Sequence, residues 1–312
     1  MKFFSRNSPL FEYLKYLFSW LHTNSGMTKI ITLLFFMVSI QIQANSQSVP
    51  ADNTKPFILG VVHEIQSIQL NEKRILNIYL PDGYNPNDTT QYPVIYLLDG
   101  SADEDFIHIA GLVQFNNFPW INRMPKTILV GIANTDRKRD FTFTSQVESE
   151  KSRMPTAGGS AEFIAFLDKE LQPFIEKRYK TNKDKTLIGQ SLGGLLATEI
   201  LFKKPTLFNR YIIISPALWW NNGSLLKQDG AVLQPSFTDT TDVYIGVGKE
   251  GLAPGDFPRV MEVDANLLAD KLNSSKSKSL KVFFDYLPQE DHSTVTHQAV
   301  FNAIRLLYPP AR

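Results

Sequence analysis

The stretch from Lys185 to Ala197 constrains the fold more strongly than any other part of the chain. A short apolar run, a G-x-S-x-G pattern at residues 189–193 and a second apolar run follow one another directly. A strand before this pattern and a helix after it produce a sharp turn that exposes the serine. Glycine at both outer positions removes Cβ atoms that would clash there and tolerates strained dihedral angles. The sequence therefore predicts a candidate nucleophile, Ser191, at the end of a strand; an ordinary strand–helix turn is the alternative.

Predicted strands and helices alternate along the chain after residue 60. Besides the short run before the turn, the predicted strands cover residues 61–70, 74–80, 92–98, 127–133, 211–214, 243–247 and 280–287, and the predicted helices cover residues 105–113, 160–175, 192–203, 259–272 and 295–307. The first two strands are expected to form an antiparallel hairpin. The unbroken apolar runs that follow are typical of parallel strands covered on both faces. We therefore predict an α/β fold with a mainly parallel central sheet and helices on both faces.

Two features interrupt this alternation. Residues 134–159 are mostly polar and are expected to form a long loop, of a kind that often carries function. In the helix predicted next, Ser160 is the expected N-cap and Pro173 is expected to produce a kink.

The composition excludes several classes of protein. The chain has 312 residues, of which 43% are hydrophobic, and we expect a single α/β domain over residues 61–312. Its net charge of +1 includes no basic block, so we expect no nucleic-acid partner. The chain has no cysteine, which excludes a disulfide framework, thiolate metal sites and a cysteine nucleophile. We expect no metal and no other cofactor.

The N-terminus has the features of a targeting segment. Met27 and Lys29 precede an almost wholly apolar run over residues 30–40, and Ala44 is the candidate cleavage position. This run is too short to span a bilayer. We expect residues 1–44 to be an N-terminal extension plus a signal peptide that starts at Met27, and residues 45–60 to be a flexible lead-in. The mature protein is then expected to be periplasmic or secreted, without stable membrane insertion; an uncleaved anchor is the alternative.

A serine nucleophile needs a base, and histidine is best suited to that task near neutral pH. His292 lies in a polar segment between the last predicted strand and the last predicted helix, where this architecture places the base. The other four histidines fall in the N-terminal extension, in the first predicted strand or inside predicted helices. The base needs a carboxylate partner, which comes after a strand and between serine and histidine in chain order. Glu250 fits best, and Asp256 is the main rival.

The remaining candidates concern the substrate. An oxyanion would need backbone N–H donors, which we expect from Leu192 and from either Gly100 or Ser101. Trp219 and Trp220 follow a predicted strand and are candidates for contact with a planar acyl or aryl group, although one of them is as plausibly buried packing.

Arg137 and Arg139 are candidates for pairing with an anionic substrate such as a catecholate. A solvated charged loop is the alternative, and it is the more ordinary interpretation for such a segment.

Five stretches carry a resemblance to a known family, and they lie at residues 92–100, 171–179, 189–195, 215–220 and 290–293. In this order they resemble the putative-esterase family of α/β-hydrolases, which includes enterochelin esterase-like, esterase D-like and feruloyl esterase-like enzymes. The similarity extends from about Val61 to Leu307. It implies an α/β-hydrolase fold with Ser191 as nucleophile, His292 as base and Glu250 at the acid position. The chain departs from many members at residues 290–291, where Glu-Asp stands in place of a glycine before the histidine.

These observations predict a metal-independent serine esterase, with a catecholate-siderophore ester or a glycan or plant acyl ester as substrate. An acyltransferase of the same fold is one alternative. A catalytically silent binding protein on a hydrolase scaffold is the other, because a fold alone proves no activity.

Overall fold

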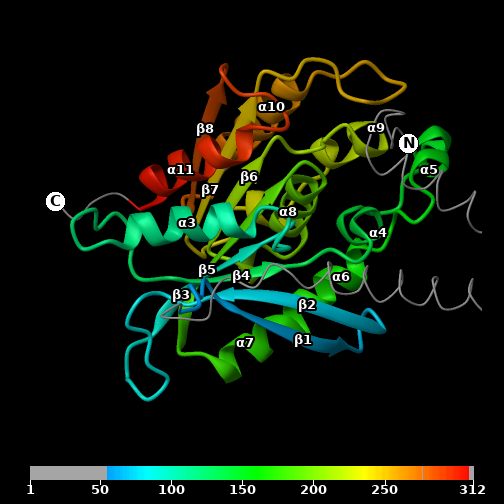
Figure 1. Cartoon of the computed structure of the whole chain (residues 1–312). Coiled ribbons are helices and arrows are strands. Elements are labelled where there is room, and N and C mark those ends of the chain that lie inside the picture. The colour runs from blue at the N-terminus through cyan, green and yellow to red at the C-terminus, as the bar shows by residue number, and fades with distance from the viewer. Residues whose placement is uncertain (1–54, 276, 309–312) are drawn as a thin grey trace, which may run out of the picture. The chain divides into compact units, whose positions relative to one another are not determined.

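An eight-stranded sheet runs through the computed structural model, which describes residues 55–275 and 277–308 (Figure 1). The strand order is β1-β2-β4-β3-β5-β6-β7-β8. The strands are β1 Val61–Ser67, β2 Glu72–Tyr79, β3 Tyr92–Leu97, β4 Ile128–Ile132, β5 Thr181–Gln190, β6 Arg210–Ile214, β7 Thr241–Gly248 and β8 Leu280–Leu287. Strands β1 and β2 form the expected hairpin, β2 is also antiparallel to β4, and the other pairs are parallel. The predicted α/β fold class is thereby confirmed.

Helices cover both faces of this sheet (Figure 1). Their bounds are α3 Phe106–Asn117, α4 Arg137–Phe141, α5 Glu148–Arg153, α6 Ser160–Phe166, α7 Gln172–Arg178, α8 Leu192–Lys203, α9 Trp220–Gly223, α10 Met261–Asn273 and α11 Val295–Leu307. Helices α3 and α11 enclose one hydrophobic cluster with the sheet, and α6, α7, α8 and α10 enclose the other.

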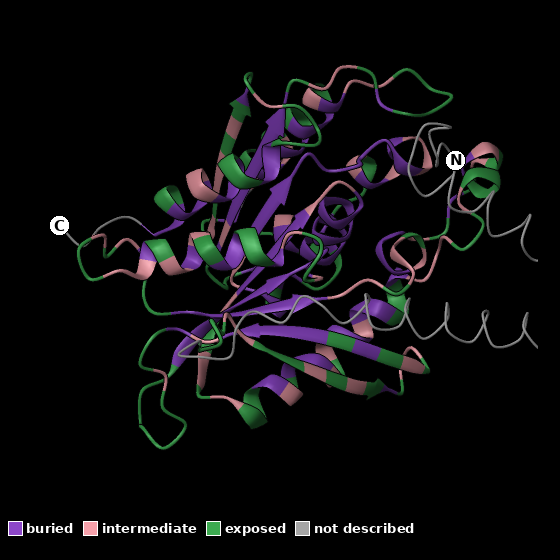
Figure 2. Cartoon of the chain, viewed as in Figure 1, coloured by how far each residue is buried: buried purple, intermediate pink, exposed green. Residues whose placement is uncertain are grey.

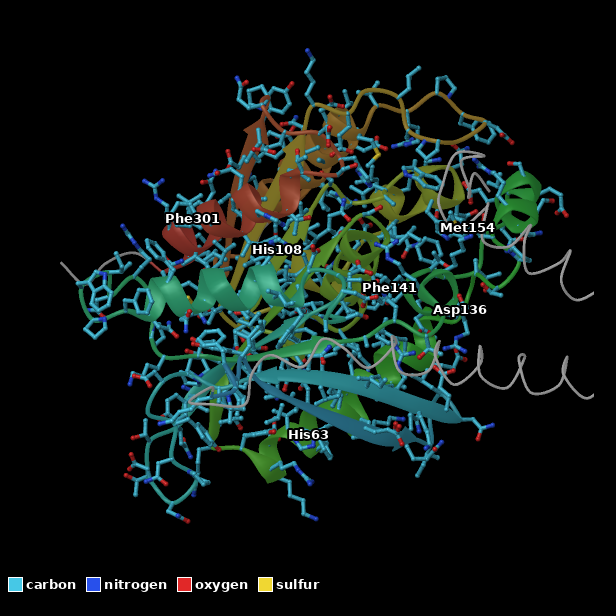
Figure 3. All side chains as sticks on the ribbon, in the orientation of Figure 1. His63, His108, Asp136, Phe141, Met154 and Phe301 are labelled. Carbon is cyan, nitrogen blue, oxygen red and sulfur yellow. The ribbon has the colours of Figure 1, made fainter. Side chains whose placement is uncertain are left out.

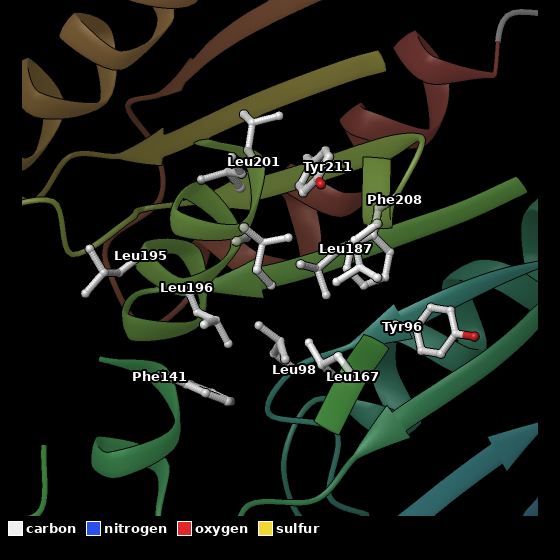
Figure 4. Close-up of a cluster of buried hydrophobic side chains, with 14 of the residues drawn as sticks. Tyr96, Leu98, Phe141, Leu167, Leu187, Leu195, Leu196, Leu201, Phe208 and Tyr211 are labelled. Atoms are coloured by element: carbon white, nitrogen blue, oxygen red, sulfur yellow. The ribbon is translucent and has the colours of Figure 1, made fainter. Parts of the chain in front are cut away.

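Strand β6 shows why the parallel strands are apolar throughout. Ile212 and Ile214 belong to the cluster with α3 and α11, whereas Tyr211 and Ile213 belong to the cluster with α8. Successive side chains point to opposite faces of a strand, so both faces of β6 are buried. Figure 2 shows this burial along the central strands, and Figure 4 shows part of the cluster around α8, including Leu187 and Tyr211.

The segment over residues 134–159 is not a simple loop, contrary to our expectation. It contains α4 and α5, and the carboxylate of Asp136 accepts a hydrogen bond from the Arg139 backbone N–H (3.0 Å) at the start of α4. The charged composition of these two short helices leaves no apolar periodicity from which to predict them.

The helix predicted over residues 160–175 is divided in three. Gly159 rather than Ser160 precedes its first turn, so the N-cap prediction was wrong by one residue. A π-helical turn, Leu167–Leu171, separates α6 from α7, and Pro173 lies in the first turn of α7. Proline has no N–H to donate to a preceding carbonyl, which interrupts the regular helix. The expected irregularity is present as this wider π-helical turn.

The expected signal peptide at 1–44 and most of the lead-in at 45–60 lie outside the described residues. Residues 58–308 belong to one compact unit. Across the described part of the chain, no helix combines the length and the apolar character that crossing a bilayer requires.

Candidate active site

The G-x-S-x-G residues form a sharp turn between β5 and α8. Ser191 has φ 59° and ψ −117°, a conformation that residues with a side chain rarely adopt. Its backbone N–H donates to the Ile214 carbonyl (3.0 Å), and its own carbonyl accepts from Leu195 and Ala217 (both 2.9 Å). A Cβ on Gly189 would lie 2.4 Å from the Gly193 carbonyl oxygen, which explains the need for glycine there. The turn therefore holds a strained serine in place from three sides.

His292 and Glu250 lie in line with this serine. The Nε2 atom of His292 is 3.0 Å from the Ser191 Oγ, and its Nδ1 is 2.6 Å from the Glu250 Oε2. A carboxylate oxygen only accepts, so Nδ1 carries the proton and the lone pair of Nε2 faces the serine hydroxyl. The Glu250 side chain is 4% exposed and His292 is 44% exposed. The structure thus brings together three residues that are 42 to 101 positions apart in the chain.

The loops that carry the acid and the histidine are tied to each other. The Lys249 backbone N–H donates to the Glu290 carbonyl (2.7 Å), and a Cβ on Gly248 would lie 2.7 Å from that same oxygen. Asp291, directly before the histidine, accepts from the backbone N–H groups of Ser293 (2.8 Å) and Thr294 (3.1 Å). This local turn fixes the backbone around His292 by hydrogen bonds that a glycine could not provide.

The rival acid, Asp256, does not take part in this arrangement. It is exposed in the loop between β7 and α10 and does not line the cavity at the serine. Of the two candidate acids, it is Glu250 that contacts the histidine ring.

The three candidate oxyanion donors differ in what their N–H groups do. Leu192 begins α8, and within the described residues its N–H has no hydrogen-bond acceptor. The Gly100 N–H is already bonded to the Ile132 carbonyl (3.0 Å), so the prediction for Gly100 as a donor was wrong. Gly100 is needed instead for close packing, because a Cβ there would lie 2.4 Å from the backbone of β4. The Ser101 N–H donates to the exposed Glu104 carboxylate at 3.2 Å, a long hydrogen bond that an oxyanion can replace.

A cavity of about 220 Å³ opens at the serine. It is lined by Ser191, Trp219, Glu250, Leu252, Pro254, Met261 and His292. Of the two candidate tryptophans, only Trp219 contributes to this wall. Trp220 is fully buried, and its Nε1 donates to the Phe143 carbonyl (2.8 Å), so it packs in the hydrophobic core. The apolar residues of the β7–α10 loop were missed, because no sequence pattern marks a lining residue in an irregular segment.

Arg137 pairs with the protein itself. Its guanidinium makes two hydrogen bonds to the Asp99 carboxylate (2.6 and 2.9 Å) and a third to the Gln190 carbonyl (3.2 Å). Burial lowers the pKa of Arg137, but the hydrogen bonds and charge of Asp99 outweigh this effect and raise the pKa. The side chain connects the loop after β3 to the turn at Ser191 and does not line the cavity at the serine.

Arg139 belongs to a different cluster, between β2 and α4. It pairs with Glu72 (2.6 Å) and Asp140 (2.7 Å), and the fully buried Arg74 pairs with the same two carboxylates (2.8 and 2.7 Å). Arg139 does not line the cavity at the serine. Its predicted role in substrate binding is therefore replaced by a structural one.

His63 lies in β1 (Figure 3), where its ring packs edge-on against Phe174 of α7, and it does not line the cavity at the serine. Its Nε2 is 2.6 Å from the Tyr179 hydroxyl, and burial together with the charge of Arg178 lowers its pKa. Among the described residues, no group of three histidine, aspartate or glutamate side chains is arranged to hold a metal ion.

Comparison with known proteins gives a family and several relatives. The chain matches the family described as "Putative esterase" over residues 67–301. Ferri-bacillibactin esterase BesA from Bacillus subtilis (strain 168) is 28% identical over 264 residues, which cover 77% of this chain and 87% of that protein. Among solved structures, an IroE-like serine hydrolase from Shewanella oneidensis is 33% identical, with a TM-score of 0.71 and 80% of each chain covered. The BES protein from Bacillus cereus is 26% identical, with a TM-score of 0.67, and covers 82% of this chain and 98% of its own.

The family match spans most of the chain, and the two solved relatives share its fold over at least 80% of each chain. The protein therefore belongs to the "Putative esterase" family of α/β-hydrolases.

Proposed function

We propose that this protein is a serine-dependent carboxylic-ester hydrolase that acts through an acyl-enzyme. The observation that carries the proposal is a chain of two hydrogen bonds. One joins Ser191 Oγ to His292 Nε2 (3.0 Å), and the other joins His292 Nδ1 to Glu250 Oε2 (2.6 Å). A hydroxyl hydrogen-bonded to a neutral imidazole, which is itself oriented by a carboxylate, is the arrangement that activates serine.

The steps follow from the positions of these groups. His292 Nε2 accepts the proton of Ser191 as Oγ attacks the ester carbonyl carbon, and Glu250 stabilises the imidazolium that forms. The Leu192 N–H and, once Glu104 is displaced, the Ser101 N–H stabilise the oxyanion. His292 then donates its proton to the departing alkoxide oxygen, which leaves an acyl group on Ser191. Water, deprotonated by His292, attacks this acyl group and releases the acid with the serine regenerated.

For the substrate, we propose an ester of a catecholate siderophore. Two observations support it: the relative named ferri-bacillibactin esterase covers most of both chains, and Trp219 gives the cavity a flat aromatic wall. We also propose that the protein acts outside the cytoplasm, on the support of the apolar segment at residues 30–40 and the absence of cysteine.

A fluorophosphonate probe and p-nitrophenyl acetate test the reaction, with Ser191→Ala as the matched variant. We expect wild type to be labelled and to hydrolyse the acetate, and Ser191→Ala to do neither. Equal labelling and turnover by Ser191→Ala would end the proposal.

A substrate panel then tests the ester class. Hydrolysis of a catecholate trilactone should exceed that of methyl ferulate in kcat/KM, and the reverse order would favour plant acyl esters. Transfer of the acyl group to an added alcohol in preference to water would identify an acyltransferase.

A further inference from the structure

The acid Glu250 has a second oxygen that the relay to the serine does not use. Its Oε2 faces His292, and its Oε1 accepts a hydrogen bond from the Ser215 hydroxyl. Within the described residues, no other side chain donates to Glu250. The Glu250 side chain is 4% exposed, so water contributes little to its hydrogen bonding. The Ser215 hydroxyl therefore supplies one of the two side-chain hydrogen bonds to this carboxylate.

The backbone of Ser215 is held in a conformation that favours glycine. Ser215 directly follows β6, is fully buried and has φ 42°. Its N–H donates to the Gly246 carbonyl (2.7 Å) of the neighbouring strand β7, which fixes this conformation. A glycine would adopt the same angles without steric strain. A serine at this position therefore carries backbone strain that a glycine would not. In return, its hydroxyl forms the hydrogen bond to the Glu250 carboxylate.

A separate residue fixes the backbone of the acid. The Glu262 carboxylate, in the first turn of α10, accepts hydrogen bonds from the N–H groups of Glu250 (2.8 Å) and Gly251 (3.0 Å). These bonds hold the main chain but leave the side-chain torsions of Glu250 free. The hydrogen bonds from Ser215 and His292 are therefore what restricts rotation of the Glu250 carboxylate.

We propose that Ser215 is a positioning residue of the active site: its hydroxyl orients the Glu250 carboxylate so that Oε2 meets His292 Nδ1. This inference rests on the proposed function, since a well-placed imidazole matters only if Ser191 is a nucleophile. Without the hydroxyl, the carboxylate rotates more freely and the histidine loses part of its preferred orientation.

Ser215→Gly tests this assignment, because it removes the hydroxyl and relieves the strain together. We expect kcat for p-nitrophenyl acetate to fall by about tenfold or more, with KM nearly unchanged. The melting temperature is measured alongside, because relief of the backbone strain and loss of a hydrogen bond to a buried carboxylate change the stability in opposite directions. The matched control is Ser145→Ala, which removes a hydroxyl that donates to the buried Glu150 (2.5 Å) outside the relay, and kcat should not change.

A double-mutant cycle separates positioning from general damage. In a Glu250→Ala background, Ser215→Gly should cost little further activity, because the carboxylate that it orients is gone. Equal losses in both backgrounds would overturn the proposal, as would wild-type kcat in Ser215→Gly. If Ser215→Gly fails to fold, Ser215→Ala takes its place, judged by the same coupling.

A proton NMR measurement needs no substrate. The Nδ1–H of His292 should give a downfield resonance in wild type that weakens or moves in Ser215→Gly and is unchanged in Ser145→Ala. An unchanged resonance in Ser215→Gly would also overturn the assignment. If wild type hydrolyses no ester, the proposed function fails, whereas this resonance still reports on the hydrogen bond between the acid and the histidine.

Discussion

Replacing Glu250 by glutamine should move the imidazole proton of His292 from Nδ1 to Nε2. The Glu250 Oε2 accepts the Nδ1 proton at 2.6 Å, whereas a glutamine can present its amide nitrogen to the same atom. The Ser215 hydroxyl can donate to the amide oxygen, so nothing prevents this orientation. The proton of the imidazole then moves to Nε2, which points at Ser191 and can no longer accept the serine proton.

The expected loss is about 10⁴-fold in kcat, the size found when the acid of such a triad is converted to its amide. This corresponds to roughly 5.4 kcal/mol of transition-state stabilisation at about 1.36 kcal/mol per tenfold. Steady-state hydrolysis of p-nitrophenyl acetate measures it, and labelling by a fluorophosphonate should slow in parallel.

Asp256→Asn is the matched control, because Asp256 is the nearest rival in sequence and is exposed. It should leave kcat within about twofold of wild type, a ratio worth roughly 0.4 kcal/mol. A larger loss in Asp256→Asn than in Glu250→Gln would refute the assignment of the acid. So would a loss below tenfold in Glu250→Gln.

Three further predictions follow from particular contacts. Gly189→Ala places a Cβ 2.4 Å from a backbone oxygen and should destabilise the fold by about 1–3 kcal/mol in urea unfolding, along with a loss of labelling. Arg74→Met leaves the buried Asp140 with one cation in place of two and should cost about 3–5 kcal/mol in the same assay, whereas Lys73→Met, which breaks an exposed pair, should leave the unfolding midpoint unchanged. Trp219→Ala should raise KM for esters with an aromatic acyl group by about tenfold, with little change for p-nitrophenyl acetate, whose acyl group is small. Trp120→Ala, at a site 75% exposed, should change neither, and equal effects of the two substitutions would contradict a role for Trp219 in the cavity wall.

Most of the fold could be predicted from the sequence because its signals are local. The parallel strands are buried on both faces, so they appear as unbroken apolar runs, and α8 occupies the predicted residues 192–203. The short helices α4 and α5 were missed for the opposite reason. Few of their residues are buried, and α4 begins with a side-chain cap at Asp136 rather than with an apolar pattern.

The sequence predicted those site residues whose role follows from their type and their place after a strand. A serine between glycines, a histidine after the last strand and an acid after β7 follow from chain order. The roles of Gly100 and Arg137 depended instead on partners far away in the sequence. The Gly100 N–H is taken by a carbonyl of β4, and the Arg137 guanidinium by Asp99, 38 positions earlier. No pattern within either segment indicates that those groups are already occupied.

The anchoring of Gly251 by Glu262 divides the β7–α10 loop into two parts with different freedom to change. Upstream of the anchor lies Glu250, whose position the chemistry dictates. Downstream lie Leu252 and Pro254, whose apolar side chains line the cavity and take no part in the hydrogen bonds that hold the acid. Under the proposed function, the downstream residues can therefore be exchanged to accept a different acyl group without moving the acid. A library randomised at Leu252 and Pro254 is the starting point for altering selectivity.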